Sequence, residues 1–379
     1  MSTPLDIHYM RRAMTLAQRG EGHVNPNPLV GAVVVDSRKE GDDGIIAEGW
    51  HHRYGDLHAE RDAFRNADAS GADCRGMTMY VTLEPCCHHG HQPPCTEAIV
   101  ERGIKRVVVG LTDPNPLVAG KGLALLKDAG IEVEMIGSTG EGRELERQLR
   151  YQNRVFLHYM TSWRPWVTMK YAMTLDGKIC TSSGDSRWVS GEEARRRVHE
   201  MRHEYMSIVC GIGTVLADDP MLNTRLEGKN DARNPIRIVA DRRLRLPLDC
   251  RLAATARDIP TIVAHSEGVD QGKRDALQAL GIRTWECNSL RALLERMHAE
   301  RIDGMLLEGG GTLNEAFLRE GLVDEVFAFI APKIVGGSKA KTPVEGEGLL
   351  RMADAVQLRD VKTERLGEDI LVRALCSQV

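Results

Sequence analysis

The sequence predicts an α/β protein with two domains. Short runs of β-branched residues alternate with amphipathic segments of helical length, a pattern that favours sheets covered by helices on both faces. The chain has 379 residues, which is too long for one ordinary hydrophobic core. Its hydrophobic fraction of 42% and charged fraction of 27% are typical of a globular protein.

The first half alternates strands and helices, beginning with a helix. The apolar runs on either side of the sequence GDDG predict a hairpin with a rather long loop. One later segment starts with Pro and ends with Gly, as helices prefer. In chain order we expect a helix over 6–19, strands over 29–36 and 45–50, a helix over 58–67, a strand over 77–83, a helix over 93–103, a strand over 106–111, a helix over 120–130, a strand over 132–136 and a long polar helix over 141–160.

The second half restarts the α/β pattern after the sequence SWRPW. We place the boundary near Arg164 and Pro165, so that residues 1–150 form one domain, 151–164 the end of a linking helix, and 165–379 the other domain. In chain order we expect a strand over 167–179, a helix over 191–205, strands over 207–213, 235–241, 261–265 and 304–311, a helix over 314–321, a strand over 324–332 and a C-terminal hairpin ending at 370–375.

Composition argues against several classes of protein. The net charge of −4 and the aromatic fraction of 4% do not favour a nucleic-acid-binding surface. The sequence has no apolar run of about eighteen residues and no signal-peptide core, so we expect a cytoplasmic protein. The nine cysteines are an odd number in a chain long enough to bury a core, which does not suggest a disulfide framework.

Four residues of the first half suggest a catalytic zinc site. His58 opens a predicted helix, Cys86 follows a strand and a Pro, and Cys95 begins another helix. One imidazole and two thiolates leave the fourth tetrahedral position open, as in catalytic zinc sites. Glu60 lies two residues after His58, where it can exchange protons with a zinc-activated water and a leaving amine. Zinc deaminases combine His-x-Glu and Pro-Cys in this way.

A structural zinc site is the main alternative interpretation of these residues. Such a site recruits a fourth protein ligand, and the intervening loop offers four candidates: Cys87, His88, His89 and His91. Buried cysteines beside a surface histidine are another alternative. The sequence HAE followed by a strand, EPC and PPC is much more specific than HAE alone, and it favours the catalytic site.

The wider motif pattern resembles the bifunctional deaminase/reductase family of riboflavin biosynthesis. Eight residues separate Cys86 from Cys95 in PCCHHGHQPPC, where most nucleoside and nucleic-acid deaminases have two. The resemblance includes NPNPLVGAVVV, GWHHRYGDLHAE and RVVVGLTDPNPLVAGKG in the first half. It continues through RPWVTMKYAMTLDGKI, GDSRWVSGEEAR, GTVLADDPMLNTR, LLEGGGTLNEAF and IAPKIVGG, and so covers nearly the whole chain.

The resemblance implies two folds and two consecutive reactions. The first domain would be a cytidine-deaminase-like three-layer α/β/α domain, and the second a dihydrofolate-reductase-like α/β domain. The first would bind one Zn²⁺ and deaminate 2,5-diamino-6-ribosylamino-4(3H)-pyrimidinone 5′-phosphate. The second would use NADPH to reduce the ribosyl group to a ribityl chain. The resemblance also suggests a homo-oligomer, a dimer or tetramer.

In the deaminase half, the resemblance places Asn27, His51 and His88 at the substrate. Where the family usually has Lys or Arg to meet the substrate phosphate, this chain has His91. Since histidine titrates near neutrality, we hypothesise that substrate binding weakens as pH rises from 6 to 8. The alternative is that the phosphate is held elsewhere. Cys87 also departs from the family and could compete for zinc.

The reductase half lacks the Gly-x-Gly-x-x-Gly fingerprint of standard dinucleotide-binding domains. Its glycine-rich segment EGGGTLNEA follows a strand late in the chain and opens a helix, where backbone N–H groups can meet a pyrophosphate. Carried over by motif, the NADPH-binding positions are Met173, Trp188, Thr214, Asp218, Arg242, Gly310, Gly311, Thr312, Leu313, Asn314, Glu315 and Ala316. The substrate-binding positions are Ser186, Arg202, Leu222, Arg225 and Glu308.

Three positions of this half have more than one interpretation. Arg242 replaces a smaller polar residue of some members and could reach the 2′-phosphate of NADPH. Arg202 lies in a heavily charged segment, so the residues alone would place it on a solvated helix face. Asp176 precedes Gly177 in an ordinary turn pair, and we assign it no catalytic role.

Two rival functions remain open from the sequence alone. One is a nucleic-acid or nucleoside deaminase with an appended binding domain, which the charge, the few aromatics and the cysteine spacing disfavour. The other is a non-enzymatic zinc-stabilised scaffold, which an intact Glu60 disfavours. The residues do not decide between NADPH and NADH, nor whether the intermediate passes directly between the sites.

Overall fold

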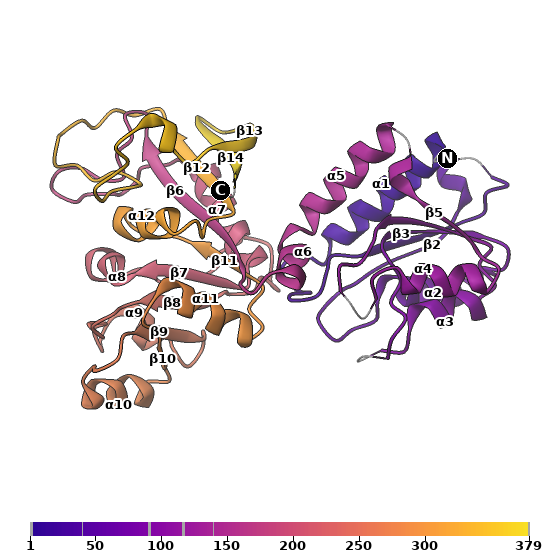
Figure 1. The fold of residues 1–379 in the computed structure, drawn as a ribbon, viewed down its shortest axis with the longest axis horizontal. Helices are drawn as coiled ribbons and strands as arrows, with labels where there is room; N and C mark the ends of the chain where they lie inside the picture. Colours follow the sequence, from indigo (N-terminus) through magenta and orange to yellow (C-terminus); the bar gives the residue numbers. More distant parts are fainter. Residues whose placement is uncertain (1–2, 40, 90–91, 116–117, 139, 378–379) are drawn as a thin grey trace. The chain divides into compact units, whose positions relative to one another are not determined.

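The computed structural model describes residues 3–39, 41–89, 92–115, 118–138 and 140–377. The chain divides into two compact units, Met1–Ser162 and Trp163–Val379, each with its own sheet and its own core. Figure 1 shows helices packed on the sheet of each unit. We call Met1–Ser162 the N-terminal unit and Trp163–Val379 the C-terminal unit. Among the described residues, no helix combines the length and the apolar character needed to cross a membrane.

The N-terminal unit is built on a five-stranded sheet of order β2-β1-β3-β4-β5. Strands β1, β2 and β3 pair antiparallel, whereas β3, β4 and β5 are parallel. The elements are α1 (Pro4–Gln18), β1 (Gly31–Val35), the 3₁₀ turn η1 (Gly41–Gly44), β2 (Ile45–Trp50), α2 (Ala59–Ser70), β3 (Thr78–Leu83), α3 (Cys95–Glu101), β4 (Arg106–Leu111), α4 (Lys121–Asp128), β5 (Glu132–Met135), η2 (Ile136–Ser138), α5 (Gly140–Gln152) and α6 (Arg154–Thr161).

The alternation of side chains along the strands creates two cores in this unit. Ala32 and Val34 of β1 face a core shared with α2, α3 and α4, which contribute Phe64, Ile99 and Leu126. Val33 and Val35 face the opposite core, which α1, α5 and α6 complete with residues such as Met10, Leu149 and Phe156. The unit is therefore a three-layer α/β/α domain, as expected.

Two glycines allow helices to approach this sheet closely. A Cβ on Gly31 of β1 would lie 2.0 Å from the Ala13 carbonyl oxygen of α1. A Cβ on Gly49 of β2 would lie 2.2 Å from the Ala63 nitrogen of α2. Both distances are far below van der Waals contact, so any larger residue would push the helix away. Gly49 thus allows α2, the helix that carries Glu60, to pack close to the sheet.

The C-terminal unit contains a nine-stranded sheet of order β10-β9-β8-β7-β11-β6-β12-β14-β13. All its neighbours from β10 to β12 are parallel, and the hairpin β13–β14 is antiparallel. The elements are β6 (Trp166–Thr174), α7 (Glu192–Glu204), β7 (Ser207–Gly211), α8 (Ile212–Asp218), β8 (Ile236–Ala240), α9 (Arg251–Ala254), β9 (Thr261–His265), α10 (Gln271–Ala279), β10 (Arg283–Glu286), α11 (Leu290–Ala299), β11 (Gly304–Leu307), α12 (Gly311–Arg319), β12 (Glu325–Ala331), η3 (Met352–Asp354), β13 (Leu358–Leu366) and β14 (Asp369–Cys376).

This sheet is also covered on both faces. Val209 of β7 faces a core with Met297 of α11 and Phe317 of α12. The adjacent Ile208 faces the other way, toward a core that includes Leu252 of α9 and Leu277 of α10. The parallel strands β8, β7, β11 and β6 end at one edge of the sheet, where ligands of such folds usually bind.

The fold differs from the sequence-based expectation in several places. The expected strands over 167–179 and 304–311 end early, at Thr174 and Leu307, and Gly311 already begins α12. The expected helix over 141–160 is interrupted at Asn153, which leaves the helical region at φ −99° and ψ 16° and separates α5 from α6. The expected strand over 207–213 ends at Gly211, and Ile212 begins α8. Between 251 and 303 the sequence analysis expected one strand, whereas the structure also contains α9, α10, β10 and α11.

Candidate functional site

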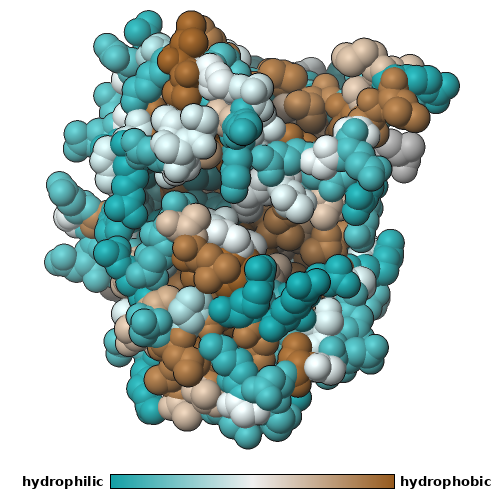
Figure 2. Space-filling model, turned by 90° about the vertical axis from the view of Figure 1, so that its left-hand side faces the viewer, coloured by the Kyte–Doolittle hydropathy of each residue, from teal (hydrophilic) through white to brown (hydrophobic). Residues whose placement is uncertain are grey.

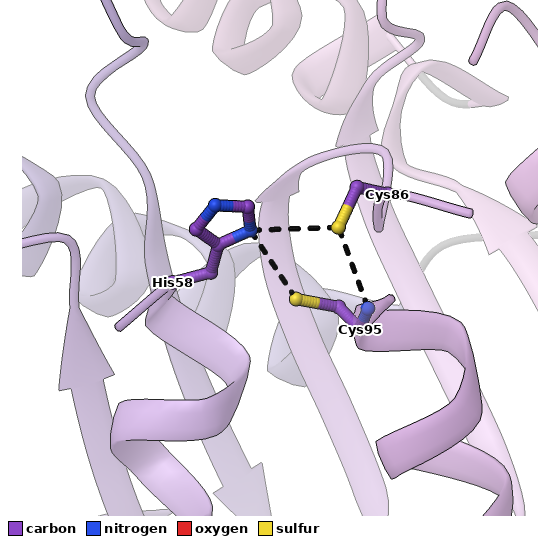
Figure 3. A group of neighbouring side chains, drawn as sticks. All are labelled: His58, Cys86 and Cys95. Carbon is purple, nitrogen blue, oxygen red and sulfur yellow. Dashed lines mark hydrogen bonds between the residues drawn. The ribbon is translucent and has the colours of Figure 1, made fainter. Parts of the chain in front are cut away.

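His58, Cys86 and Cys95 converge in the N-terminal unit (Figure 3). His58 is the N-cap of α2, Cys86 follows β3, and Cys95 is the first residue of α3. The Nδ1 atom of His58 lies 3.4 Å from Cys86 Sγ and 3.5 Å from Cys95 Sγ. Two helix N-termini and one strand end therefore bring three soft ligands to one point.

The spacing of these ligand atoms fits a zinc ion. Zinc bond lengths and tetrahedral angles place an imidazole nitrogen and a thiolate sulfur about 3.5 Å apart, which matches both observed distances. The three atoms all lie within 4.8 Å of one another. Among the residues that the structure describes, no other group of this kind is present, and neither Cys87, His88 nor His89 joins it. The described residues thus offer three ligands, the number typical of catalytic zinc.

The surroundings of Cys86 support a thiolate, whereas the hydrogen bond with Cys86 and burial raise the pKa of the Cys95 thiol. The Cys95 N–H donates to Cys86 Sγ at 3.4 Å. The side-chain hydrogen bond from Cys95, with smaller effects from His58 and the Cys95 backbone, outweighs burial and lowers the pKa of the Cys86 thiol to about 4. A thiolate is the form that binds a metal.

Glu60 is buried in the first turn of α2, with 3% of its surface exposed. Burial, and next to it the nearby Cys86 thiolate, raise the pKa of the Glu60 carboxyl. A carboxyl group whose pKa moves toward neutrality is suited to both accepting and donating a proton. This is the arrangement required of a general acid and base beside a metal ion.

Asn27, His51 and His88 belong to the same unit. His51 is buried, its Nδ1 lies 3.0 Å from the Leu57 carbonyl, and its Nε2 lies 3.2 Å from the Asn27 amide nitrogen. The His51 ring contacts the His58 ring edge-on at 5.6 Å between centroids. Burial lowers the pKa of His51, so the ring is neutral. Among the described residues, the buried Nδ1 of His88 has no hydrogen-bond partner. His91 lies outside the described residues.

Glu84 is a residue of this region that the sequence analysis missed. It is 3% exposed and accepts backbone hydrogen bonds from Asp113, Gly120, Gly122 and Leu123 at 3.0–3.3 Å. Glu84 therefore ties the loop after β4 and the start of α4 to the segment that carries Cys86. Its position directly before Pro85 and Cys86 was the available signal.

The C-terminal unit contains a cavity of about 270 Å³ near the carboxyl end of its parallel strands. Ser186, Trp188, Arg202, Arg225 and Glu308 all line it, so the structure brings together four of the five expected substrate positions and one expected NADPH position. The remaining expected positions do not line this cavity: Met173, Thr214, Asp218, Leu222, Arg242 and 310–316. Lys170, Arg195 and His199 also line it, and the sequence analysis gave none of them a role.

Glu308 links two cations at the base of the cavity. Its carboxylate accepts from Arg202 Nε at 2.7 Å and Nη2 at 3.0 Å, and from Lys170 Nζ at 3.0 Å. Burial alone would raise the pKa of Glu308, but these two cations outweigh it and hold the pKa well below its usual range. Arg202 therefore points into the unit, and its interpretation as a solvated surface residue is wrong.

The expected NADPH positions lie at the carboxyl ends of parallel strands. Met173 is near the end of β6, and Thr214 and Asp218 lie in α8 after β7. Arg242 follows β8 and is exposed, with its Nε 3.5 Å from Ser266 Oγ. Gly310 is the N-cap of α12, and a Cβ there would lie 3.8 Å from Thr214 Oγ1. The turn between β11 and α12 thus lies beside α8.

Buried contacts fix the glycine-rich segment. Asn314 is fully buried and donates to the Pro343 carbonyl at 2.9 Å. A Cβ on Gly311 would lie 2.7 Å from the Thr342 carbonyl oxygen. This turn leaves no room for side chains on its inner surface, and the Glu345 side chain lies against Gly311 and Thr312 at the N-terminus of α12.

Known family models match both units. The zinc-binding region of cytidine and deoxycytidylate deaminases matches residues 4–111, and the RibD C-terminal domain matches residues 165–372. The riboflavin biosynthesis protein RibD of Actinobacillus pleuropneumoniae is 48% identical over 376 residues, which are 98% of this chain and 95% of that protein. The RibD protein of Escherichia coli strain K12 is 37% identical over 96% of this chain and 98% of its own length.

Solved structures of similar proteins match nearly the whole length of this chain. RibD of Acinetobacter baumannii has a TM-score of 0.85 at 38% identity, over 98% of this chain and 99% of the other. A diaminohydroxyphosphoribosylaminopyrimidine deaminase/5-amino-6-(5-phosphoribosylamino)uracil reductase from Thermotoga maritima gives the same TM-score, identity and coverage. The chain therefore belongs to the RibD family of bifunctional riboflavin biosynthesis proteins, in which a zinc-binding deaminase domain is joined to an NADPH-using reductase domain.

Proposed function

We propose that residues 1–150 deaminate 2,5-diamino-6-ribosylamino-4(3H)-pyrimidinone 5′-phosphate, and that residues 165–379 then reduce its ribosyl group with NADPH. Residues 151–164, expected as the end of a linking helix, include α6, whose Phe156 packs in the core of the N-terminal unit. The observation that carries the proposal is the convergence of His58, Cys86 and Cys95 beside a buried Glu60.

In the deaminase reaction, zinc held by these three ligands would supply the Lewis acidity that activates water. Glu60 is the residue that we assign to proton transfer. Its carboxylate takes a proton from the attacking water and delivers it to the departing amine nitrogen. We assign Asn27, His51 and His88 to substrate binding, because His51 is held neutral beside His58 and the buried His88 Nδ1 lacks a partner among the described residues.

In the reductase reaction, bound NADPH would supply the hydride, and the protein would orient the ribosyl carbon toward it. We assign Ser186, Arg202, Leu222, Arg225 and Glu308 to the substrate, with the two arginines facing its phosphate. The cofactor positions are Met173, Trp188, Thr214, Asp218, Arg242 and 310–316, which follow the carboxyl ends of β6, β7, β8 and β11 or lie near them.

A coupled assay tests the two-step reaction. The diaminopyrimidine phosphate is supplied with and without NADPH, while ammonia release and NADPH absorbance are followed. Ammonia release without NADPH, followed by NADPH oxidation in the complete mixture, is the expected result. Deamination of tRNA or DNA oligonucleotides in place of the small substrate would overturn the proposal and favour the rival nucleic-acid deaminase.

The substitution Glu60→Gln separates the two activities. We expect ammonia release to fall by about 10²–10⁴-fold, the usual contribution of a general acid or base. Zinc content should stay at one ion per chain, and reduction of the deaminated intermediate should proceed at the normal rate. Full deaminase activity in this variant would remove Glu60 from the mechanism.

We further propose a homo-oligomer in the cytoplasm, a dimer or tetramer. Support comes from the C-terminal segment, where Ile334, Leu349, Leu350 and Met352 are more than half exposed. Figure 2 shows apolar side chains gathered among hydrophilic ones on one face. Light scattering of the purified chain measures the oligomeric state, and a monomer at micromolar concentration would contradict this proposal.

A further inference from the structure

The three ligands of the zinc site belong to different elements of the N-terminal unit. His58 is the N-cap of α2 and Cys95 begins α3, and Figure 3 shows them at the starts of two separate helices. Eight residues separate Cys86 from Cys95 along the chain. A longer loop fixes the distance between its ends less well, because more conformations are lost when it closes. A contact that joins the segment before Cys95 to α2 would therefore help to keep the ligands in register.

Arg61 of α2 makes such a contact. Its guanidinium donates from Nε to the Pro93 carbonyl at 3.1 Å and from Nη2 to the Pro94 carbonyl at 2.8 Å. Pro93 and Pro94 are the two residues directly before Cys95. Because the guanidinium is planar and its donors have a fixed geometry, two bonds to consecutive carbonyls set direction as well as distance. We call these two hydrogen bonds the Arg61 bridge.

Other contacts hold the two cysteines together but leave α2 out. The N–H and the hydroxyl of Thr96 donate to the Cys86 carbonyl at 3.2 Å and 3.3 Å. Phe64 of α2 and Ile99 of α3 pack in one core, which places the two helices side by side. The Arg61 bridge adds a polar contact between α2 and the N-terminus of α3, at the end where the ligands lie.

The positive charge of Arg61 gives no reason for its place beside a metal site. A cation repels a metal ion, so the charge by itself would weaken zinc binding. Both hydrogen bonds of the bridge go to neutral carbonyl oxygens that lie 32 and 33 residues away in the sequence. The geometry thus favours a role in positioning the backbone over a role of the charge.

We propose that Arg61 is a positioning residue of the zinc site, which joins the Pro93–Pro94 segment to α2 and so holds Cys95 Sγ at its distance of 3.5 Å from His58 Nδ1. Arg61 acts through the two carbonyls and is not itself a ligand. The inference rests on the proposed deaminase site, although zinc retention can be measured without turnover. Partners that orient metal ligands typically contribute about 10–100-fold to metal affinity.

Zinc release from the full-length holoenzyme tests the proposal directly. An excess of a chromophoric chelator is added, and the rate of release is followed by absorbance. Arg61→Met keeps the aliphatic stem without the donors, and we expect it to release zinc about 10–100-fold faster. Arg61→Lys keeps the charge but replaces the planar pair of donors by one ammonium group, so its rate should lie between the two.

Two results of this experiment would contradict the proposal. An unchanged rate in Arg61→Met would show that the bridge does not hold the ligands. Slower release from Arg61→Met would show that Arg61 acts on the ion through repulsion between charges.

Arg65→Met is the matched control. Arg65 lies one turn further along α2 and pairs with Asp62. The variant removes the same charge from the same helix but contacts neither carbonyl, and an exposed ion pair contributes little, so zinc release should stay within about twofold of normal. The thermal midpoints of the metal-free variants are measured beside it. Equal acceleration of release in both variants would leave Arg61 with a general structural role alone.

Cobalt substitution reports on the geometry of the site. The visible absorption of Co²⁺ depends on the arrangement of its ligands, so the spectrum of Arg61→Met should change and that of Arg65→Met should not. With zinc in excess, Arg61→Met should recover the normal kcat for ammonia release at an unchanged KM, because the bridge is directed at the backbone. A raised KM at full zinc occupancy would assign Arg61 to the substrate and overturn the positioning role.

The zinc and ammonia measurements separate the possible failures. A chain that retains zinc but releases no ammonia would overturn the proposed deaminase function, while faster zinc release from Arg61→Met would still establish the bridge. Normal ammonia release by the unchanged protein, with the same zinc release rate in Arg61→Met, would do the opposite.

Discussion

Asp6 shows how one buried side chain can set the acid stability of the N-terminal unit. It is 1% exposed, caps α1 through Thr3, and accepts from the Tyr80 hydroxyl at 2.8 Å and from Arg106 at 2.7 Å. Burial alone would raise its pKa, but these hydrogen bonds outweigh burial and lower the pKa to about 2. The stabilising effect is therefore complete above pH 4 and is lost as pH falls toward 2.

We expect Asp6→Asn to lower the free energy of unfolding by about 2 kcal/mol at pH 7, the equivalent of its pKa shift. The difference from the unchanged protein should shrink between pH 4 and pH 2, since both then carry an uncharged group. Urea unfolding at several pH values measures it. Asp73→Asn, at an exposed position, is the control. A difference independent of pH would show that charge is not the cause.

Glu308 provides a second prediction at the level of single residues. Its removal leaves Arg202 and Lys170 in a buried site without their counter-ion. Breaking a buried pair in this way typically costs about 3–5 kcal/mol. We expect Glu308→Gln to reduce NADPH oxidation by more than about a hundredfold. Ammonia release from the same sample is the internal control and should not change.

At the level of elements, the close contact of β2 with α2 positions His58 and Glu60. In Gly49→Ala the new Cβ would overlap the Ala63 nitrogen and the Ala59 carbonyl oxygen of α2. We expect α2 to shift with His58 and Glu60, and the overpacking to cost about 1–3 kcal/mol or more. Zinc content and ammonia release should fall together.

Gly140→Ala is the matched control for this prediction. Gly140 is the first residue of α5, and a Cβ there meets no described atom within 4 Å. Metal analysis after gel filtration, together with the thermal midpoint, separates the two variants. Unchanged zinc content in Gly49→Ala would show that the sheet can yield without moving the site.

Element patterns explain how much could be predicted from sequence. The strand over 77–83 is indicated by its apolar run, and the helix over 93–103 by a Pro at its start and a Gly at its end. These local signals suffice to predict both elements. Asn153 was not identified as a break because its neighbours continue the polar helical pattern; its side chain instead accepts from the Leu29 N–H and donates to the Leu29 carbonyl. That pairing is distant in sequence, and no local pattern reveals it.

The same distinction applies to the two sites. The metal ligands are short motifs whose spacing already indicates chemistry, and the structure brings His58, Cys86 and Cys95 together. Glu84 and Arg61 depend on loops more than twenty residues away, so single-sequence reasoning gave neither a role. The reductase positions came from the family resemblance, because glycines and arginines alone are too common to identify a cofactor site.

At the level of the whole molecule, two separate cores imply two separate responses to metal removal. Zinc would bind only the folded N-terminal unit, and a ligand stabilises the state that binds it. We expect calorimetry of the full chain to show two unfolding transitions. A chelator should lower one of them by several degrees, since about 1 kcal/mol moves the midpoint by about 2–4 °C at this size.

The activities should divide in the same way. Chelation should stop ammonia release, and added zinc should restore it, whereas NADPH oxidation with deaminated substrate should continue throughout. A single transition that moves as a whole, or joint loss of both activities, would contradict the independence of the two units.

The edge strand β13 has a consequence for how copies of this chain can associate. It ends the nine-stranded sheet, and all its residues except Leu366 are exposed. Its pairing with β14 is interrupted between Arg359 and Lys362, where Asp360 has a φ of 52°. A bulged strand dense in alternating charges cannot receive another strand in register. The last hairpin therefore blocks strand pairing between molecules at this edge of the sheet. Edge-to-edge association of this kind is the first step toward fibrils.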